Sequence, residues 1–424
     1  MVTILTGIVF LATYALIVTE KIPRAVAAAA GASVLVLFGV LSQETAIHHI
    51  DWNTLGLLIG MMIIVDLTKR SGVFGFLAIW VAKNVKADPV KLMLALSALT
   101  AVLSAFLDNV TTVLLVVPVT LAITDTLKLN PIPLLLTQIM ASNIGGTATL
   151  IGDPPNIMIA GPAGLSFGDF LINLAPAAII ILFVTLYFFY LIYRKQLHTT
   201  EEAKADLMQQ NEWEEIKDWR LLKRSLFVLA LTILGFALHS IIHVETAAIA
   251  LSGAMLLMIL AHEEPEEVFL AIEWPTIFFF AGLFVLVGGL VEVGILDRLA
   301  QISLDLTGGN LMTMALLILW LSAISSAFVD NIPFVATMIP LIQKVAAMGG
   351  LGPEAVEPLW WALALGACLG GNGTIVGASA NVIVAGIAEK NGYRISYMQY
   401  LKNGFPLMIL SIIISTGYIL LRYY

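Results

Sequence analysis

Cysteine, histidine and charge are all scarce in this chain of 424 residues. The single cysteine, Cys368, excludes a disulfide framework and a cysteine-rich metal site. The six histidines are dispersed and no Walker A lysine motif is present, so we expect no metal centre, no cofactor and no bound ATP. Neither an enzyme nor a nucleic-acid-binding protein is indicated.

Charged residues make up only 12% of the chain, whereas apolar residues make up 59%. The apolar residues form long runs rather than the alternating segments of about ten residues that are typical of a transmembrane β-barrel. This composition, kept over the whole length, predicts an all-α polytopic membrane protein.

The stretch Ser142–Asn156 interrupts apolar sequence on both sides. It has glycine at three positions and a Pro154-Pro155 pair, so a helix cannot run smoothly through it. Unwound backbone at membrane depth is tolerated only where it is buried in protein or lines a water-filled cavity. An ordinary loop between two short helices is the alternative. We favour a broken helix that lines a transport site, because the chain contains a second copy.

The second copy is Gly370–Asn381, in which Gly370 aligns with Gly145 and Asn381 aligns with Asn156 without a gap. Farther upstream, Asp108-Asn109 aligns with Asp330-Asn331. The chain therefore consists of two related halves, and each half has an Asp-Asn element followed by a glycine-rich break.

The predicted first repeat, residues 1–193, has spans at 4–18, 25–40, 54–67 and 170–193, a re-entrant hairpin at 92–124 and a broken helix at 132–160. A connector of soluble character follows at 194–224. The predicted second repeat, residues 225–424, has spans at 225–241, 246–260, 277–290 and 404–421, a hairpin at 311–343 and a broken helix at 360–388. This layout gives about ten crossings plus two hairpins. A further segment, 73–82, is predicted to lie at the membrane interface, and 295–306 is an amphipathic segment.

Most of the 21 Lys and Arg residues fall on one side of this layout when the N-terminus is placed outside. The positive-inside rule then predicts both termini outside and the connector in the cytoplasm. The expected location is the inner (plasma) membrane of the cell. Because an odd number of crossings precedes the connector, the second repeat is inverted relative to the first. Inverted repeats whose discontinuous helices meet at the bilayer midplane are typical of secondary transporters.

A hairpin tip paired with Ser-Asn-Ile-Gly-Gly-Thr-Ala-Thr-Leu-Ile-Gly-Asp-Pro-Pro-Asn resembles the ion transporter superfamily. The similarity is greatest to its arsenite-permease (ArsB/NhaD) branch and to the melanosomal P-protein relatives, and it covers nearly the whole chain. The dicarboxylate branch has Ser-Asn-Thr at its tips, whereas these tips read Asp108-Asn109-Val110 and Asp330-Asn331-Ile332. The loss of both threonine hydroxyls and the gain of two carboxylates disfavour binding of a dianion.

An ionised aspartate within hydrocarbon costs about 3 kcal/mol or more, so intramembrane acids are functional by default. Asp108 and Asp330 are therefore candidate proton carriers, or ligands of a sodium ion together with Asn109 and Asn331. Each also has the position of a helix N-cap, a structural role that does not exclude the first. Asp153 is a third candidate for ion coupling, because its counterpart in the second repeat is Ala378.

The resemblance implies export of arsenite or antimonite coupled to proton influx by alternating access. Arsenite at neutral pH is an uncharged trihydroxide, and neither motif contains a Lys or Arg to bind an anion. The candidate substrate-binding residues are Asn109, Thr111, Asn143, Gly145, Gly146, Thr147, Asn331, Gly370, Gly371, Asn372 and Thr374. Alternatives are sodium/proton antiport, organic-anion transport of the dicarboxylate or citrate type, and a channel. The expected partners are a small neutral or anionic solute, a coupling proton or sodium ion and the lipid bilayer, with an arsenite-stimulated ATPase left open.

The predicted orientation can be tested by labelling single cysteines in a Cys368→Ser background. In intact cells, a membrane-impermeant maleimide should label Gly164→Cys, in the predicted external loop, and leave Gln210→Cys in the connector unlabelled. Labelling of Gln210→Cys but not of Gly164→Cys would show that the orientation is the opposite of the predicted one.

Overall fold

The computed structural model of the chain describes residues 2–19 and 21–424, and every regular element in that part is a helix. Ten of these helices are long and apolar enough to cross a membrane. They are not the ten crossings of the sequence prediction, because four of them are hairpin arms, whereas several predicted crossings are short or broken helices. The all-helical, polytopic class and the two hairpins are as predicted.

The helices of the first half begin with α1 (Val2–Thr19), α2 (Arg24–Leu37), α3 (Gln43–His48), α4 (Trp52–Arg70) and α5 (Val73–Asn84). The first hairpin consists of α6 (Pro89–Phe106) and α7 (Asn109–Thr126), and the first broken helix consists of α8 (Ile132–Thr147) and α9 (Pro154–Ala163). α10 (Phe167–Asn173) and α11 (Ala175–Tyr193) complete this half, and α12 (Glu201–Gln209) and the 3₁₀ turn η1 (Glu212–Glu215) form the connector.

The second half contains α13 (Trp219–Ile242), α14 (Thr246–Ala261), α15 (Pro265–Leu270), α16 (Trp274–Glu292) and α17 (Ile295–Thr307). Its hairpin consists of α18 (Leu311–Phe328) and α19 (Asn331–Gly349), and its broken helix consists of α20 (Pro353–Gly370) and α21 (Ser379–Lys390). The last helix is α22 (Tyr397–Tyr423). The second broken helix starts at Pro353 and not at Trp360 as predicted, because proline fits the first position of a helix.

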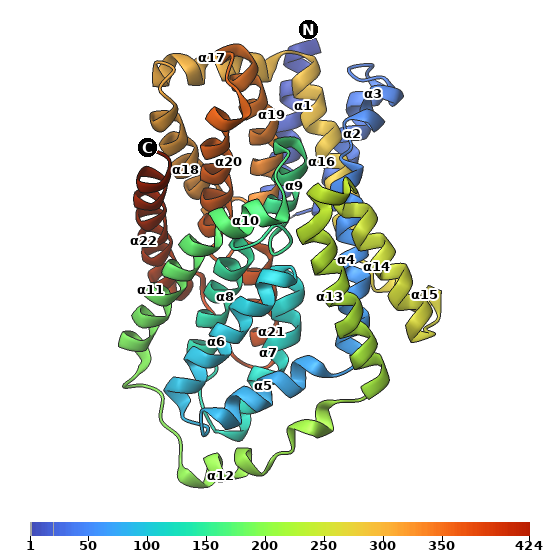
Figure 1. Ribbon diagram of the computed structural model, residues 1–424. Helices are drawn as coiled ribbons and strands as arrows, with labels where there is room; N and C mark the ends of the chain where they lie inside the picture. The colour runs from blue at the N-terminus through green and yellow to red at the C-terminus, as the bar shows by residue number, and fades with distance from the viewer. Residues whose placement is uncertain (1, 20) are drawn as a thin grey trace.

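The two hairpins lie toward opposite ends of the molecule, with α6 and α7 low and α18 and α19 high in Figure 1. Both termini lie toward the upper end and the connector helix α12 lies at the lower end (Figure 1). The elements of the two repeats are thus inverted relative to each other. Which end faces the cytoplasm remains a prediction, as do the boundaries of the repeats at 193/194 and 224/225.

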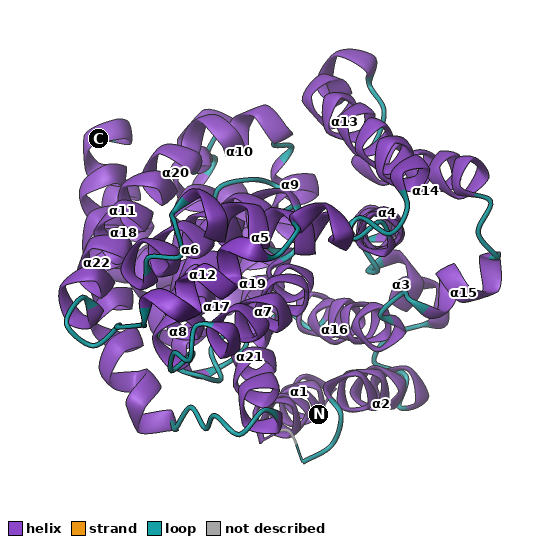
Figure 2. Cartoon of the chain, turned by 90° about the horizontal axis from the view of Figure 1, so that it is seen from below, coloured by secondary structure: helices purple, strands orange, loops and turns teal. Residues whose placement is uncertain are grey.

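The helices form two groups, which lie side by side when viewed along the bundle (Figure 2). We call α1, α2, α4, α13, α14 and α16 the scaffold group, and the hairpins and broken helices the core group. Within the scaffold, α4 packs on α14 where Gly60 meets Ala250, and α2 packs on α16 where Gly282 meets Ala28. These two contacts are repeat counterparts, and small residues at both allow the helix backbones to approach closely.

The connector is attached to α5, which runs across the lower end of the molecule in Figure 1. The Lys83 ammonium donates to the Glu212 carboxylate at 2.6 Å and holds the pKa of that carboxyl below its usual value. Trp213 stacks on Trp219 and contacts Phe76 in a tilted arrangement, with ring centroids 5.6 and 4.7 Å away. Because α5 in turn packs on α7, the connector is linked to the first hairpin.

The contact between α8 and α6 predicts a sharp difference between two glycine substitutions. A Cβ at Gly145 would lie 2.1 Å from the carbonyl oxygen of Ala101, whereas a Cβ at Gly386 on α21 meets nothing within 4 Å. Gly145→Ala should therefore destabilise the protein by about 1–3 kcal/mol through overpacking. Gly386→Ala should be neutral or stabilising, because alanine is the better helix former. Thermal unfolding of the two purified variants in detergent would compare them, and equal melting temperatures would contradict this packing.

Candidate functional site

Four helices begin at one internal cavity. The cavity has a volume of about 40 Å³, and the first residues of α7, α9, α19 and α21 line it together with side chains from α2, α4 and α16. Its lining residues are Arg24, Leu58, Met62, Asp108, Asn109, Val110, Asp153, Pro154, Glu273, Thr276, Asn331, Ile332, Ala378 and Ser379. Helix N-termini present unpaired N–H groups and a positive dipole end, so this is an electropositive backbone setting for acidic side chains.

Each hairpin tip turns on an aspartate that caps the second arm. Asp108 accepts from the backbone N–H of Thr111 at 2.9 Å, and its other carboxylate oxygen accepts from the Thr111 hydroxyl. Asp330 accepts from the backbone N–H of Ile332 at 3.1 Å. The N-cap role expected for both residues is therefore present, and Thr111 contributes to the cap rather than to the cavity wall.

The two tips differ at one position that decides the partners of Asp330. The repeat counterpart of Thr111 is Pro333, which has neither an N–H nor a hydroxyl to donate. The second oxygen of Asp330 instead accepts from Arg24 Nη1 at 2.9 Å and from the Ser379 hydroxyl at 2.9 Å. Arg24 also donates to Ser379 at 2.7 Å and lies over the ring of Phe279 at 5.2 Å.

Arg24 is a site residue that the sequence analysis misses. It begins α2, and in the sequence it resembles any of the basic residues that flank a span. The repeat gives no signal either, since its counterpart is Thr246. Its presence in the cavity removes the argument that the site lacks a cationic group for an anion.

Asp153 lines the same cavity and is 1% exposed. Its Oδ1 accepts from the amide of Asn331 at 3.4 Å, the thiol of Cys368 lies beside the carboxylate, and no described residue makes a hydrogen bond to its Oδ2 at hydrogen-bond distance. Buried carboxylate oxygens are nearly always hydrogen-bonded or bound to a cation. The bond to Asn331 links the first broken helix to the second hairpin tip.

A chain of buried asparagines runs from the first tip to the second break. The amide of Asn109 donates to Asn143 at 3.3 Å, and the amide of Asn143 donates to Asn372 and to Asn381 at 2.9 Å each. The predicted residues Asn109, Asn143 and Asn372 thus come together. Of these three, only Asn109 lines the cavity.

The backbone of each break is satisfied by an asparagine from the helix that follows it. The Asn156 amide donates to the carbonyls of Gly146, Thr147 and Thr149 at 3.4, 3.2 and 2.8 Å. The Asn381 amide donates to the carbonyls of Gly371 and Thr374 at 2.7 and 3.0 Å. The sequence analysis expects these groups to face a solute, but in this conformation the protein itself pairs them.

The remaining predicted binding residues pack within the breaks or against the hairpins. A Cβ at Gly145 or Gly370 would strike the backbone of α6 or α18, and one at Gly146 or Gly371 would crowd the opposite side of its own break. The hydroxyl of Thr147 donates to the carbonyl of Asn143 at 2.8 Å, and that of Thr374 donates to Ala327. These positions pack behind the described residues that line the cavity, and they do not line it themselves.

Glu273 and Cys368 are further residues near the cavity to which the sequence analysis gives no role. Glu273 lines it from the start of α16 and accepts from the Thr276 hydroxyl at 3.1 Å. Its repeat counterpart, Asp51, accepts from Thr54 in the same way at 2.6 Å, so the repeat is the signal that finds it. The thiol of Cys368 lies 3.6 Å from Asn156 Oδ1, fully within the core group.

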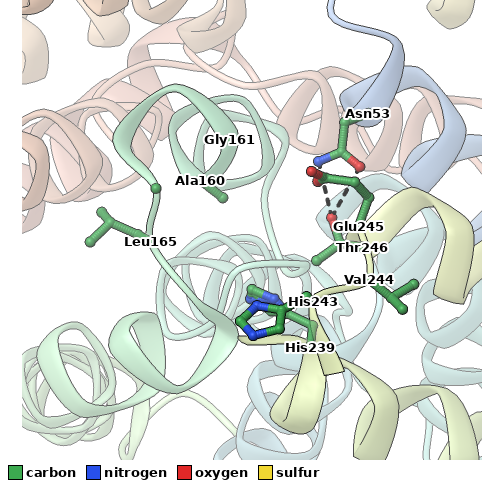
Figure 3. A pocket seen from close by; sticks show the side chains of 10 residues that line it. Asn53, Ala160, Gly161, Leu165, His239, His243, Val244, Glu245 and Thr246 are labelled. Carbon is green, nitrogen blue, oxygen red and sulfur yellow. Dashed lines mark hydrogen bonds between the residues drawn. The ribbon is translucent and has the colours of Figure 1, made fainter. Parts of the chain in front are cut away.

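A larger pocket of about 400 Å³ opens on the surface beside α9 and the start of α14. Figure 3 shows His239 and His243 on one side of it and Asn53, Glu245 and Thr246 on another. Asn53 donates to the Thr246 hydroxyl at 3.2 Å and accepts from the N–H of Ala247 at 2.9 Å. Thr246 is the repeat counterpart of Arg24, and it is the one lining residue of this pocket whose counterpart lines the internal cavity.

Comparison with protein families gives a match over residues 14–366 to CitMHS, described as a citrate transporter family. The chain belongs to this family. The family is one of transporters, so the chain is a membrane transporter and not an enzyme. Two uncharacterized transporters of Mycobacterium tuberculosis are 42% identical to the chain over 98% of its length and 97–98% of theirs. The 46 kDa membrane protein of Mycobacterium leprae is 41% identical over 98% of the chain and 97% of its own length.

The P protein of Homo sapiens is 34% identical over the whole chain, which spans 60% of its length. The crystal structure of the YdaH transporter of Alcanivorax borkumensis has the same fold, with a TM-score of 0.59, 16% identity and coverage of 99% of this chain and 97% of that one. Membership of the ion transporter superfamily and the relation to P protein are confirmed. None of these comparisons names arsenite, and the arsenite-permease branch stays a prediction.

The asparagine chain predicts that Asn143→Ala will impair both stability and transport. The substitution leaves the side-chain oxygens of Asn372 and Asn381 without their donor inside the core, at about 1–3 kcal/mol for each unsatisfied group. Asn391→Ala, at an exposed helix end, is the matched control. Thermal unfolding and vesicle uptake should both fall for Asn143→Ala alone, and normal values for that variant would show that the chain is dispensable.

Proposed function

We propose that the chain is a cation-coupled secondary transporter of a small organic anion, and that Asp153 binds the coupling cation. The observation that carries this proposal is the buried Oδ2 of Asp153, which lines the cavity and has no hydrogen-bond partner among the described residues. A proton or a sodium ion satisfies such an oxygen. Asn331 holds the other oxygen in place and supplies an amide oxygen nearby.

The anion is supported by Arg24 and by the helix ends. A guanidinium is a planar, bidentate donor for carboxylates, and the N-termini of α9 and α21 favour negative charge. The family description points to the same substrate class. In this conformation the cavity holds only a few water-sized species, so a polycarboxylate requires the core group to move away from the scaffold.

Alternating access is supported by the matching positions of the inverted repeat. The hairpin tips lie beside Arg24 and Glu273 here, while their counterparts Thr246 and Asp51 line pockets elsewhere in the molecule. In the opposite state the core group would approach Thr246 and Asp51 instead. We further propose that the protein lies in the plasma membrane, with its N-terminus outside the cell and its connector in the cytoplasm.

Sodium/proton exchange is a second candidate, favoured by the excess of acid. Three carboxyl groups, those of Asp108, Asp153 and Glu273, line the cavity against one guanidinium. Arsenite export, the substrate implied by the resemblance, loses its main physical argument once Arg24 lies in the site. The experiment below tests sodium and arsenite as substrates as well.

The experiment measures uptake of labelled citrate, succinate, sodium and arsenite into proteoliposomes that contain the purified chain. An inward proton or sodium gradient should drive citrate or succinate above equilibrium. With no membrane potential, a tenfold gradient of one coupled cation releases about 1.4 kcal/mol, which sustains an accumulation of roughly tenfold. Asp153→Asn keeps the shape but loses the charge, so it should abolish gradient-driven accumulation.

Asp206→Asn, on the exposed face of the connector, is the matched control and should accumulate substrate normally. Accumulation by Asp153→Asn at the wild-type level would assign coupling to another group. Sodium or arsenite movement without any uptake of carboxylates would replace the organic anion with that substrate.

A further inference from the structure

The ion pair between Arg24 and Asp330 joins the two groups of helices. Arg24 is on scaffold helix α2, Asp330 is at the tip of the second hairpin, and Ser379 is the first residue of α21. One guanidinium nitrogen therefore bonds the scaffold to both core elements of the second repeat. The two side chains are 31% and 16% exposed and Arg24 lines the cavity, so the pair lies at the cavity edge.

This pair has no counterpart in the first repeat. The positions that match Arg24, Pro333 and Ser379 are Thr246, Thr111 and Pro154. In the first repeat the Thr111 hydroxyl occupies the second oxygen of Asp108, and the tip has the same helical form without any ion pair among the described residues. The hairpin fold thus does not require the pair, and Pro333 leaves Asp330 open to it.

We propose that the Arg24–Asp330 pair is exchanged during transport, so that a substrate carboxylate binds Arg24 while a second coupling cation, in addition to the one at Asp153, binds Asp330. This inference rests on the proposed function. Arg24 is then the specificity-determining residue for the anion, and the pair enforces coupling. Separating the two side chains for an anion alone leaves Asp330 uncompensated, and separating them for a cation alone leaves Arg24 uncompensated. Only both ligands together keep every charge paired.

The surrounding groups support exchange rather than a permanent lock. Ser379 donates to Asp330 and accepts from Arg24, and it can keep either side chain in place after the other has moved. The ring of Phe279 lies against the guanidinium and keeps it within the cavity through a cation–π contact. Both residues remain beside the substrate position when the pair opens.

Three variants test the exchange: Arg24→Gln, Asp330→Asn and the double variant. The double variant leaves no unpaired charge at this position, so it is the control for misfolding of the single variants. The first readout is uptake of sodium or protons into proteoliposomes without any anion. Wild type should show none above empty liposomes. Arg24→Gln frees Asp330 and should raise cation uptake at least tenfold above that of empty liposomes. Asp330→Asn and the double variant should not raise it.

The second readout is binding of labelled citrate with and without the coupling cation. Asp330→Asn frees Arg24 and should bind citrate equally in both conditions, while Arg24→Gln should bind it at least tenfold more weakly. A pair that only latches the two groups predicts the same result for both single variants, and this outcome would overturn the proposal. Cation uptake by the wild type in the absence of any anion would also overturn the proposal.

These outcomes separate the inference from the function on which it rests. If the wild type does not accumulate carboxylates, the proposed function fails irrespective of the variants. If the wild type couples normally and Arg24→Gln neither leaks cations nor loses citrate, the function stands and the exchange is refuted.

Discussion

The structure depends on how the unwound backbone of two broken helices is satisfied at the centre of a membrane protein. Peptide groups freed there have no lipid partner, so each must be paired within the protein. Asn156 and Asn381 do this by reaching back from the start of α9 and α21 to the carbonyls of the preceding segment. Thr149 and Thr374 then fasten each segment to the adjoining hairpin through Ala105 and Ala327. The breaks are therefore rigid loops, and the helix starts that surround the cavity are fixed by them.

Fixed helix starts explain why the polar side chains converge. An aspartate just before a helix can accept from the N–H groups of the next turn, and Asp108 and Asp330 are oriented by the backbone in this way. Asp153 precedes α9 at the same kind of position, but its side chain makes no cap bond and is directed to Asn331 instead. Arg24, from outside the core group, adds a positive charge to the cluster. The chemistry of the site thus comes from helix starts combined with one residue of the scaffold.

The repeat is what makes the fold predictable from sequence. The alignment of the two halves locates both hairpins and both breaks, and each is close to its predicted place. The same alignment places Asn109, Asn331 and Asp153 at the cavity. It does not identify Arg24, because the matching residue is a threonine and the contacts of Arg24 depend on how the scaffold packs on the core. The glycines of the motifs are predicted to contact solute, yet their Cβ positions are filled by neighbouring backbone, a close approach that sequence alone does not show.

The pairing of α4 with α14 and of α2 with α16 has a consequence for biogenesis. Each of these contacts joins a helix of the first half to one of the second, at backbone distances that only small residues permit. When the first half has left the ribosome, Gly60 and Ala28 still lack their partners and face lipid or the insertion machinery. The scaffold can close only after α14 and α16 are inserted, once the whole first hairpin, the first break and the connector have been made. A half-length product would therefore expose the small-residue faces of α2 and α4, which are buried against α16 and α14 in the finished protein.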